Sequence, residues 1–296
     1  MTSLRVGTRG SELALCQTRW VCDLLRTAHP SLSIEEVIIK THGDVAKEQL
    51  FGPDWPVGGF VGAIEQALLQ ERIAFAIHSY KDLQTAVTPG LIVAAVPARE
   101  VVHDVLVTKE PVELGELSRR FRIGTSSPRR AAQLRRFADV EIVPIRGNVP
   151  TRIDKLQSEG LDGVVLAAAG LKRLDLNPPY RIDLPTDRFV PAPAQGALAI
   201  QARVSDPVIP LIAEIEHEPS RVSTEAERAF LHASGAGCHT PIGALAVLEG
   251  RQITLHGQFF SDDGRRMVEG REVGDDPQSI GRRLADRLIR DLGGSS

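Results

Sequence analysis

The sequence has little cysteine and no excess of charge of either sign. Its three cysteines cannot form a paired disulfide framework, and no C-x-x-C or Cys/His cluster has the spacing of a metal site. The formal net charge is −3, which argues against a general nucleic-acid binder. With 42% hydrophobic and 25% charged residues, the composition is that of an ordered globular protein. We expect neither a metal nor a nucleic-acid partner.

Long hydrophobic runs are also absent. No stretch approaches the roughly eighteen apolar residues of a membrane-spanning helix. The chain does not begin with a charged segment, an apolar core and a small-residue cleavage site, as a secretory signal would. We therefore expect a cytoplasmic protein that does not bind a membrane. The length of 296 residues predicts two or three domains.

Positive charge is concentrated in residues 122–152, which hold seven arginines against two acidic residues. This stretch predicts a strand at 122–125, a helix from Pro128 to about Ala138 with Ser126 and Ser127 as cap residues, and a strand at 140–145. A helix start with nearby guanidinium groups is a typical anion site. So many arginines predict a small ligand with several carboxylates or phosphates.

The arginines of this stretch separate into two groups. Arg135 and Arg136 fall in the middle of the predicted helix, and we interpret them as a solvated face. The others lie where a predicted strand ends or a helix begins, where ligands collect in α/β proteins; they are Arg129, Arg130, Arg146 and Arg152.

A weak internal repeat links this stretch to the start of the chain. RVGTRGS at 5–11 and RIGTSSP at 122–128 share a strand, a Gly-Thr pair, a polar turn and a helix start. Arg9 and Ser11 are then the counterparts of the second set. The repeat predicts two similar α/β domains, each with an anion-binding turn, and a cleft between them.

Two further segments carry candidate chemistry. HSYKD follows a predicted buried strand at 73–77 and places Lys81 and Asp82 at its carboxyl end, where a cleft carboxylate is at least as plausible as a surface ion pair. Cys238 lies in SGAGCHTP, just beyond a predicted helix. On its own, this thiol is equally consistent with an ordinary loop residue.

The remaining segments predict the end of the fold. The prolines of 178–200 predict an extended hinge between lobes. Thr224 and Glu227 have the spacing of a capping box and predict a helix start there. Three short strands with a hairpin turn at 262–264 should follow. A closing helix that covers them is indicated by apolar residues at i, i+4 spacing: Ile280, Leu284, Leu288 and Leu292.

Taken together, these motifs resemble the porphobilinogen deaminase (hydroxymethylbilane synthase) family over nearly the whole chain. The resemblance is carried, in family order and spacing, by GTRGSELAL, THGD, HSYKDL, GTSSPRR, RGNVPTR, LAAAGLKRL, PAPAQGALAI and GCHTPIGA. It implies an α/β fold of three domains. The first two resemble lobes of a type II periplasmic binding protein around a cleft (residues 1–97 with 195–216, and 98–194), and the third (217–296) is a small α+β domain with a three-stranded antiparallel sheet.

The resemblance also implies the site. Cys238 would carry a dipyrromethane cofactor through a thioether, and Asp82 would be the catalytic carboxylate. The other cofactor-binding positions would be Asp44, Lys81, Thr125, Ser127, Arg129, Arg130, Arg146 and Gly147. The substrate-binding positions would be Arg9, Ser11, Arg152, Arg173 and Gln195.

The implied reaction joins four porphobilinogen units with loss of ammonia and then releases the linear tetrapyrrole by hydrolysis. Each ring carries an acetate and a propionate, which gives the arginine excess a chemical reason. The implied enzyme is a monomeric transferase of tetrapyrrole and heme biosynthesis. The chain departs from the family at Pro53 and Val57, where well-known members have lysines in a mobile loop, and in KDLQT, which replaces KDLPT.

Three other functions are compatible with parts of the sequence. A non-catalytic binding protein of the periplasmic type would explain two lobes but leaves Cys238 without a role. A phosphate-handling enzyme would use the two Gly-Thr turns, but neither G-x-x-x-x-G-K-[ST] nor G-x-G-x-x-G occurs around them. A catalytically weak paralogue of the deaminase is disfavoured by the presence of both Asp82 and Cys238.

Overall fold

The computed structural model describes residues 3–40, 61–235, 240–261 and 264–293, and these form three β-sheets. Contacts between Cα atoms divide the chain into two compact units. One unit is Met1–Arg99 with Ala197–Arg221, and the other is Glu100–Gly196 with Val222–Ser296. No helix in the described part of the chain is long and apolar enough to cross a membrane.

The first unit is built on a five-stranded sheet of order β2-β1-β3-β10-β4. Its elements are β1 (Ser3–Thr8), α1 (Glu12–Ala28), β2 (Ser33–Ile38), α3 (Gly62–Leu69), β3 (Phe75–Ser79), β4 (Leu91–Ala95), β10 (Leu198–Arg203) and α7 (Ile209–Ala213). Strands β1, β2 and β3 run parallel, whereas β10 is antiparallel to both of its neighbours. The sheet therefore takes one antiparallel strand from a distant part of the chain.

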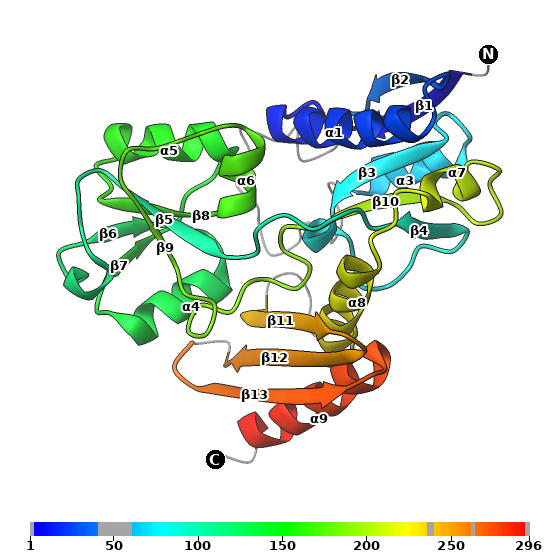
Figure 1. Cartoon of the computed structure of the whole chain (residues 1–296). Coiled ribbons are helices and arrows are strands. Elements are labelled where there is room, and N and C mark those ends of the chain that lie inside the picture. The colour runs from blue at the N-terminus through cyan, green and yellow to red at the C-terminus, as the bar shows by residue number, and fades with distance from the viewer. Residues whose placement is uncertain (1–2, 41–60, 236–239, 262–263, 294–296) are drawn as a thin grey trace. The chain divides into compact units, whose positions relative to one another are not determined.

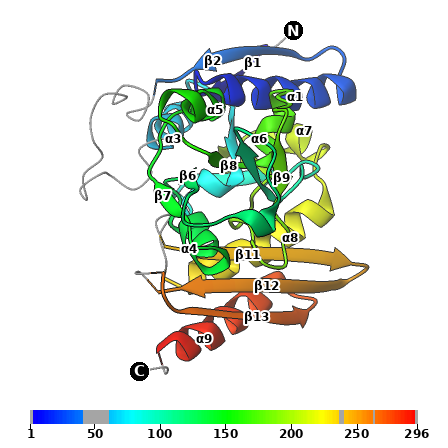
Figure 2. The same ribbon diagram turned by 90° about the vertical axis from the view of Figure 1, so that its left-hand side faces the viewer.

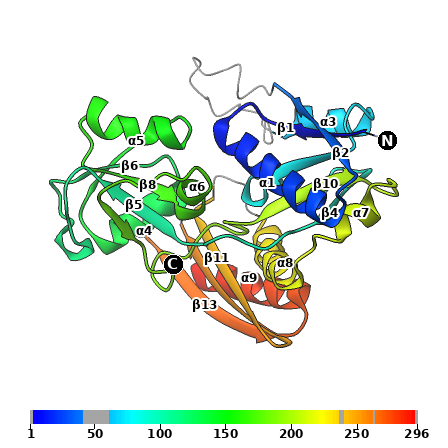
Figure 3. The same cartoon turned by 45° about the horizontal axis from the view of Figure 1, so that its top comes forward.

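Helices cover both faces of this sheet because its central strands are apolar on both sides. Val21 and Leu25 of α1 pack with Phe75 on one face, and α1 lies over the sheet in Figure 3. Ile64 of α3 packs with Ala76 on the other face, since neighbouring residues of a strand point to opposite sides. Burial on both faces explains why this strand is a nearly continuous apolar run.

The second unit repeats this topology in a sheet of order β7-β6-β8-β5-β9. Its elements are β5 (Asp104–Thr108), β6 (Arg122–Gly124), α4 (Pro128–Phe137), β7 (Glu141–Val143), α5 (Val149–Ser158), β8 (Gly163–Ala167), α6 (Ala168–Arg173) and β9 (Arg181–Asp183). Strands β6, β7 and β8 are parallel and β5 is antiparallel to both neighbours. Figure 1 shows α4 and α5 on opposite faces. The internal repeat thus corresponds to two sheets of one topology, and the prediction of two similar α/β lobes is confirmed.

The last part of the chain forms an antiparallel sheet, β11-β12-β13, as expected. Its elements are α8 (Glu218–Ala233), β11 (Ile242–Glu249), β12 (Gln252–Phe260), β13 (Met267–Gly274) and α9 (Pro277–Gly293). Figure 2 shows the three strands side by side with α9 along them. Phe230 of α8 and Leu284 of α9 fill the same core, and a Cβ at Gly281 would lie 2.6 Å from Cβ of Ala229. Both helices therefore cover one face of this sheet.

The predicted helix start was wrong in this region. Helix α8 begins at Glu218, so Thr224 and Glu227 lie inside the helix and do not form a capping box. Glu227 is fully buried, and its two carboxylate oxygens accept from the backbone N–H groups of Ala194 and Ala246, at 2.6 and 2.9 Å. The spacing of Thr224 and Glu227 is typical of a capping box, but the Glu227 side chain instead makes these tertiary hydrogen bonds. The turn at 262–264 was predicted as a hairpin, and its first two residues lie outside the described part.

Strand β10 also differs from the prediction, because the last three residues of the expected hinge, 198–200, begin a regular strand. Leu198 and Ile200 are buried in the core of the first unit, where β10 pairs with β3 and β4. The prolines that suggested an extended hinge all precede this strand, at positions 178–193. A continuous run of apolar residues predicts a buried strand here. The sequence alone does not say which sheet this strand joins.

Candidate active site

The first group of candidate residues lines a small cavity within the first unit. Ser11 is the N-cap of α1, and its hydroxyl accepts from the backbone N–H of Ala14 at 3.3 Å. A cavity of about 100 Å³ lies beside this helix start, and its walls include Arg9, Ser11, His78, Ser79 and Asp82. The repeat at 5–11 and the segment after β3 are therefore brought together, as the predicted anion-binding turn and the HSYKD motif require.

Asp82 is exposed and closes a short 3-10 turn, Tyr80–Asp82, that follows β3 directly. The strand ends two residues later than predicted, so His78 and Ser79 belong to β3 itself. Ser79 Oγ lies 3.0 Å from Nε2 of Gln17, which fixes the strand end against α1. An exposed carboxylate on a turn anchored in this way can meet a ligand without leaving a rigid element.

His78 is a buried wall of the same cavity. Only 6% of its surface is exposed, and burial lowers the pKa of its imidazole from 6.5 to about 4, which a hydrogen bond to Gln201 only partly opposes. Gln201 in turn donates to Glu65 at 2.8 Å. His78 is therefore neutral at neutral pH, and Asp82 shares the cavity with an uncharged imidazole.

The second group surrounds the start of α4 in the second unit. Ser127 is the N-cap, Pro128 is the first helical residue, and Ser127 Oγ accepts from the backbone N–H of Arg130 at 3.4 Å. Thr125 Oγ1 accepts from the backbone N–H of Ser127 at 3.2 Å. The predicted strand, cap and helix are confirmed here. The prediction that Arg135 and Arg136 form a solvated face is also confirmed, because both are exposed.

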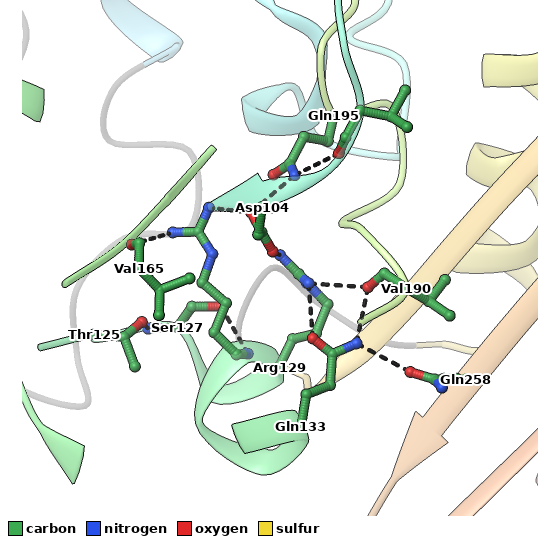
Figure 4. Close-up of polar contacts among 11 residues, drawn as sticks. Asp104, Thr125, Ser127, Arg129, Gln133, Val165, Val190, Gln195 and Gln258 are labelled. Carbon is green, nitrogen blue, oxygen red and sulfur yellow. Dashed lines mark hydrogen bonds and ion pairs between the residues drawn. The ribbon is translucent and has the colours of Figure 1, made fainter. Parts of the chain in front are cut away.

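Arg129 and Arg130 converge on one buried carboxylate, Asp104, which was not among the predicted site residues. Figure 4 shows Asp104 with Arg129 and Gln195. Arg129 Nη2 lies 2.8 Å from Oδ2 and Arg130 Nη2 lies 2.6 Å from Oδ1. Gln195 Nε2 also donates to Oδ1, at 2.9 Å. Burial lowers the pKa of Arg129 from its usual value, and the charge of Asp104 opposes this shift. A signal was present in the sequence, since an acidic residue that opens a buried apolar strand needs a buried partner.

The charge of this cluster does not balance. Among the described residues two buried guanidinium groups face one carboxylate, which leaves one excess positive charge beside the start of α4. Arg130 is 8% exposed, and its Nε is buried without a hydrogen-bond partner among the described residues. An unpartnered buried cationic donor is unfavourable unless an anion completes it. This site therefore fits a carboxylate-bearing group such as the dipyrromethane that the family resemblance implies.

The remaining predicted residues of the second unit lie near helix starts and turns. Arg146 is exposed after β7, and Gly147 has φ of +118°, a conformation that favours glycine. Helix α5 begins at Val149 with Asn148 as its cap, so Arg152 is its fourth residue and lies close to the helix start, as predicted. Arg152 Nε donates to the carbonyl of Gly147 at 2.8 Å. This contact ties the glycine turn to the helix.

Arg173 ends α6, and its Nη2 donates to the carbonyl of Gly196 at 2.7 Å. Gln195, the preceding residue, is fully buried beside Asp104. Lys81 is half-buried next to Asp82. Asp44, Pro53, Val57 and Cys238 were singled out in the sequence and lie outside the described residues.

Comparisons with known proteins agree over the whole chain. Residues 4–210 match the family model described as "Porphobilinogen deaminase, dipyromethane cofactor binding domain", and residues 222–290 match "Porphobilinogen deaminase, C-terminal domain". The chain is 43% identical over 296 residues to the porphobilinogen deaminase of Roseiflexus sp. (strain RS-1), covering 99% of this chain and 97% of that protein. It is 41% identical over 297 residues to that of Syntrophomonas wolfei, with the same coverage. Among solved structures, a periplasmic arginine-binding protein of Salmonella typhimurium is similar at 13% identity, 75% and 94% coverage and a TM-score of 0.43.

Proposed function

This chain belongs to the porphobilinogen deaminase family, and we propose from this membership that it is a hydroxymethylbilane synthase. In this function, a transferase joins four porphobilinogen units head to tail and then releases the linear tetrapyrrole. The observation that carries the proposal on the structural side is the buried excess positive charge at the start of α4, with Nε of Arg130 unpartnered among the described residues. The substrate and product of this reaction are rich in carboxylates.

The dipyrromethane would be attached at Cys238 and, when bound, supplies a pyrrole with a free α-carbon on which the product chain is built. Arg130 would bind its carboxylates together with Ser127 and the N–H groups at the start of α4. Arg129 adds charge to the same site and holds Asp104 in place. The remaining proposed cofactor contacts are Asp44, Lys81, Thr125, Arg146 and Gly147.

Asp82 would act on the incoming porphobilinogen in the cavity of the first unit. As the carbon–nitrogen bond of the aminomethyl group breaks and ammonia leaves with the bonding electrons, positive charge develops on the substrate pyrrole. A fixed carboxylate stabilises this charge without reorganisation of solvent. Asp82 would then be suited to accept the proton that is lost when the new carbon–carbon bond has formed.

Substrate carboxylates would be bound by Arg9, Ser11, Arg152, Arg173 and Gln195. Arg9 and Ser11 line the same cavity as Asp82, which supports an anion-binding role for this helix start beside the proposed catalytic carboxylate. The neutral His78 adds no positive charge beside Asp82 in this cavity. The cavity therefore combines a positive end for the substrate side chains with a negative group for the reacting ring.

The proposal is tested by giving the purified protein limiting porphobilinogen and measuring the intact mass over time. A deaminase produces a ladder of successive one-pyrrole increments, releases ammonia in equal number, and returns to its starting mass when the tetrapyrrole leaves. A binding protein of the same fold shows no covalent increment at any time, and that result would refute the proposal.

A further inference from the structure

A chain of buried contacts joins the start of α4 to the third sheet, and none of its members was expected from the sequence to link these elements. Gln133, one turn after Arg129 on α4, accepts from Arg129 Nη1 at 2.9 Å. Its amide nitrogen donates to the carbonyl of Val190 at 2.8 Å and to Oε1 of Gln258 on β12 at 3.0 Å. Arg129 Nη1 donates to the same Val190 carbonyl at 2.9 Å. Figure 4 shows the side chains converging on this carbonyl.

The segment around Val190 lies directly on the third sheet. A Cβ on Gly243 of β11 would come within 2.7 Å of the Val190 carbonyl oxygen, so the close approach requires glycine at this position. The next residue, Ala244, donates its backbone N–H to the carbonyl of Pro191 at 2.9 Å. Gln258 pairs with Gly243 in the sheet and also donates to Glu269 at 2.9 Å. Strand β11 therefore contacts this segment at two adjacent carbonyls: it bonds to that of Pro191 and packs closely against that of Val190, which Arg129 and Gln133 also contact.

Burial makes these contacts specific. Gln133 is 4% exposed, Gln258 2% and Val190 0%, so a polar group left unpaired here is unfavourable. The amides of Gln133 and Gln258 pair directly, and a buried, satisfied polar contact of this kind favours one relative register of α4 and β12. The strand that pairs with β12, β11, begins at Ile242, four residues after Cys238 in the sequence.

We propose that Gln133 and Gln258 are positioning residues that keep the strand after the cofactor cysteine in register with the carboxylate-binding start of α4. The inference rests on the proposed function, because it takes Cys238 as the attachment point. It goes further in naming what aligns the attached chain. Arg129 belongs to this link as well as to the charge cluster, since one nitrogen contacts Asp104 and the other contacts Gln133 and Val190.

The physical consequence concerns geometry more than affinity. Porphobilinogen would meet its own carboxylate contacts whether or not the link is intact. The growing end, in contrast, is positioned through Cys238 and β11, and a misplacement of about 1 Å can lower a rate by as much as about 10²-fold. Cutting the link should therefore lower kcat and leave KM nearly unchanged.

The test uses Gln133→Met and Gln258→Met in the full-length enzyme, singly and together, because methionine has nearly the length of glutamine. The control is His256→Leu on the same strand, which removes a contact to Glu269 at 3.6 Å without touching Gln133. We expect each glutamine variant to lower kcat by about tenfold or more with KM within about twofold. The double variant should be little worse than either single one, since both cut one link.

Intact mass at limiting porphobilinogen provides the second readout. The link variants should carry the two-pyrrole increment as purified and then accumulate early members of the ladder, whereas His256→Leu should resemble the parent. Parental kcat in both glutamine variants, or an equal loss in His256→Leu, would overturn the proposal. Should a variant fail to fold, the other variant supplies the same comparison. A parent protein with no increment at all would instead refute the proposed function.

Discussion

Arg130 Nη2 lies 2.6 Å from Oδ1 of Asp104, and this contact joins the helix start of the anion site to the first residue of a buried strand. Arg129 takes the other carboxylate oxygen at 2.8 Å. The carboxylate of Asp104 thus fixes the positions of both guanidinium groups. It also reduces the net charge of this buried cluster from +2 to +1. Asp104 is the group on which the geometry of this site depends.

Replacing Asp104 should destabilise the protein strongly. Asp104→Asn keeps the shape but leaves two buried cations without their counter-charge, and removing one partner of a buried ion pair costs about 3 to 5 kcal/mol. Urea unfolding measures the loss. The matched control is Asp139→Asn, which affects an exposed pair with Arg119 at 3.7 Å and should leave stability nearly unchanged. Equal, small effects would show that Asp104 has no such role.

His78 should make stability depend on pH. Its folded pKa, about 4, lies below the unfolded value of 6.5, so the unfolded state binds more protons between these pH values. The contribution is complete above about pH 6.5 and is lost as the pH falls toward 4. It amounts to about 3 kcal/mol at 1.36 kcal/mol for each pKa unit.

The measurement is the difference between the parent and His78→Gln in unfolding free energy over this pH range. All other titratable groups are present in both proteins, so their contributions to the unfolding free energy cancel in the difference. We expect the advantage of the parent to shrink by about 3 kcal/mol between pH 7 and pH 4. A difference that does not change with pH would contradict a buried neutral His78.

Asp82→Asn tests the catalytic carboxylate, since it removes the charge and keeps some hydrogen-bonding capacity. Turnover should fall by about 10²- to 10³-fold, as for the loss of other preorganised electrostatic groups. Asp82 is exposed and closes a short turn, so the unfolding free energy should change little. The cofactor should still load from preformed tetrapyrrole. Turnover near that of the parent would refute the assignment.

Substitutions of the α4 arginines should have different effects at buried and at exposed positions. Arg130→Leu removes the buried unpartnered Nε and one charge of the site, and we expect impaired cofactor assembly or chain growth. Arg135→Leu, on the exposed face of the same helix, should stay within about 0.5 kcal/mol of the parent in stability and retain its activity. Intact mass and turnover of the two variants make the comparison, and equal losses would argue against this division.

Local patterns in the sequence predicted most of the fold. The two Gly-Thr turns, Ser11, Ser127 and Pro128 are short-range signals, and the structure places them at helix starts as expected. Glu227 shows the limit of such signals, because the spacing of a cap was present while the side chain contacts Ala194 and Ala246.

The parts of the site that were missed depend on long-range contacts. Asp104 meets Arg129 across 25 residues, and Gln133 meets Gln258 across 125. No local period marks such pairs, and a buried glutamine looks like a surface one in a sequence. The antiparallel strands β5 and β10 also depend on long-range contacts, since the chain enters each of them from the other unit.

The most direct test of the account is the intact mass of the protein purified from cells that make porphobilinogen. We predict a mass above that of the chain by one two-pyrrole unit, and loss of this increment in Cys238→Ser, whereas Cys22→Ser, which changes a buried thiol of α1, should keep it. A parent protein with the mass of the bare chain, or an increment that persists in Cys238→Ser, would contradict it.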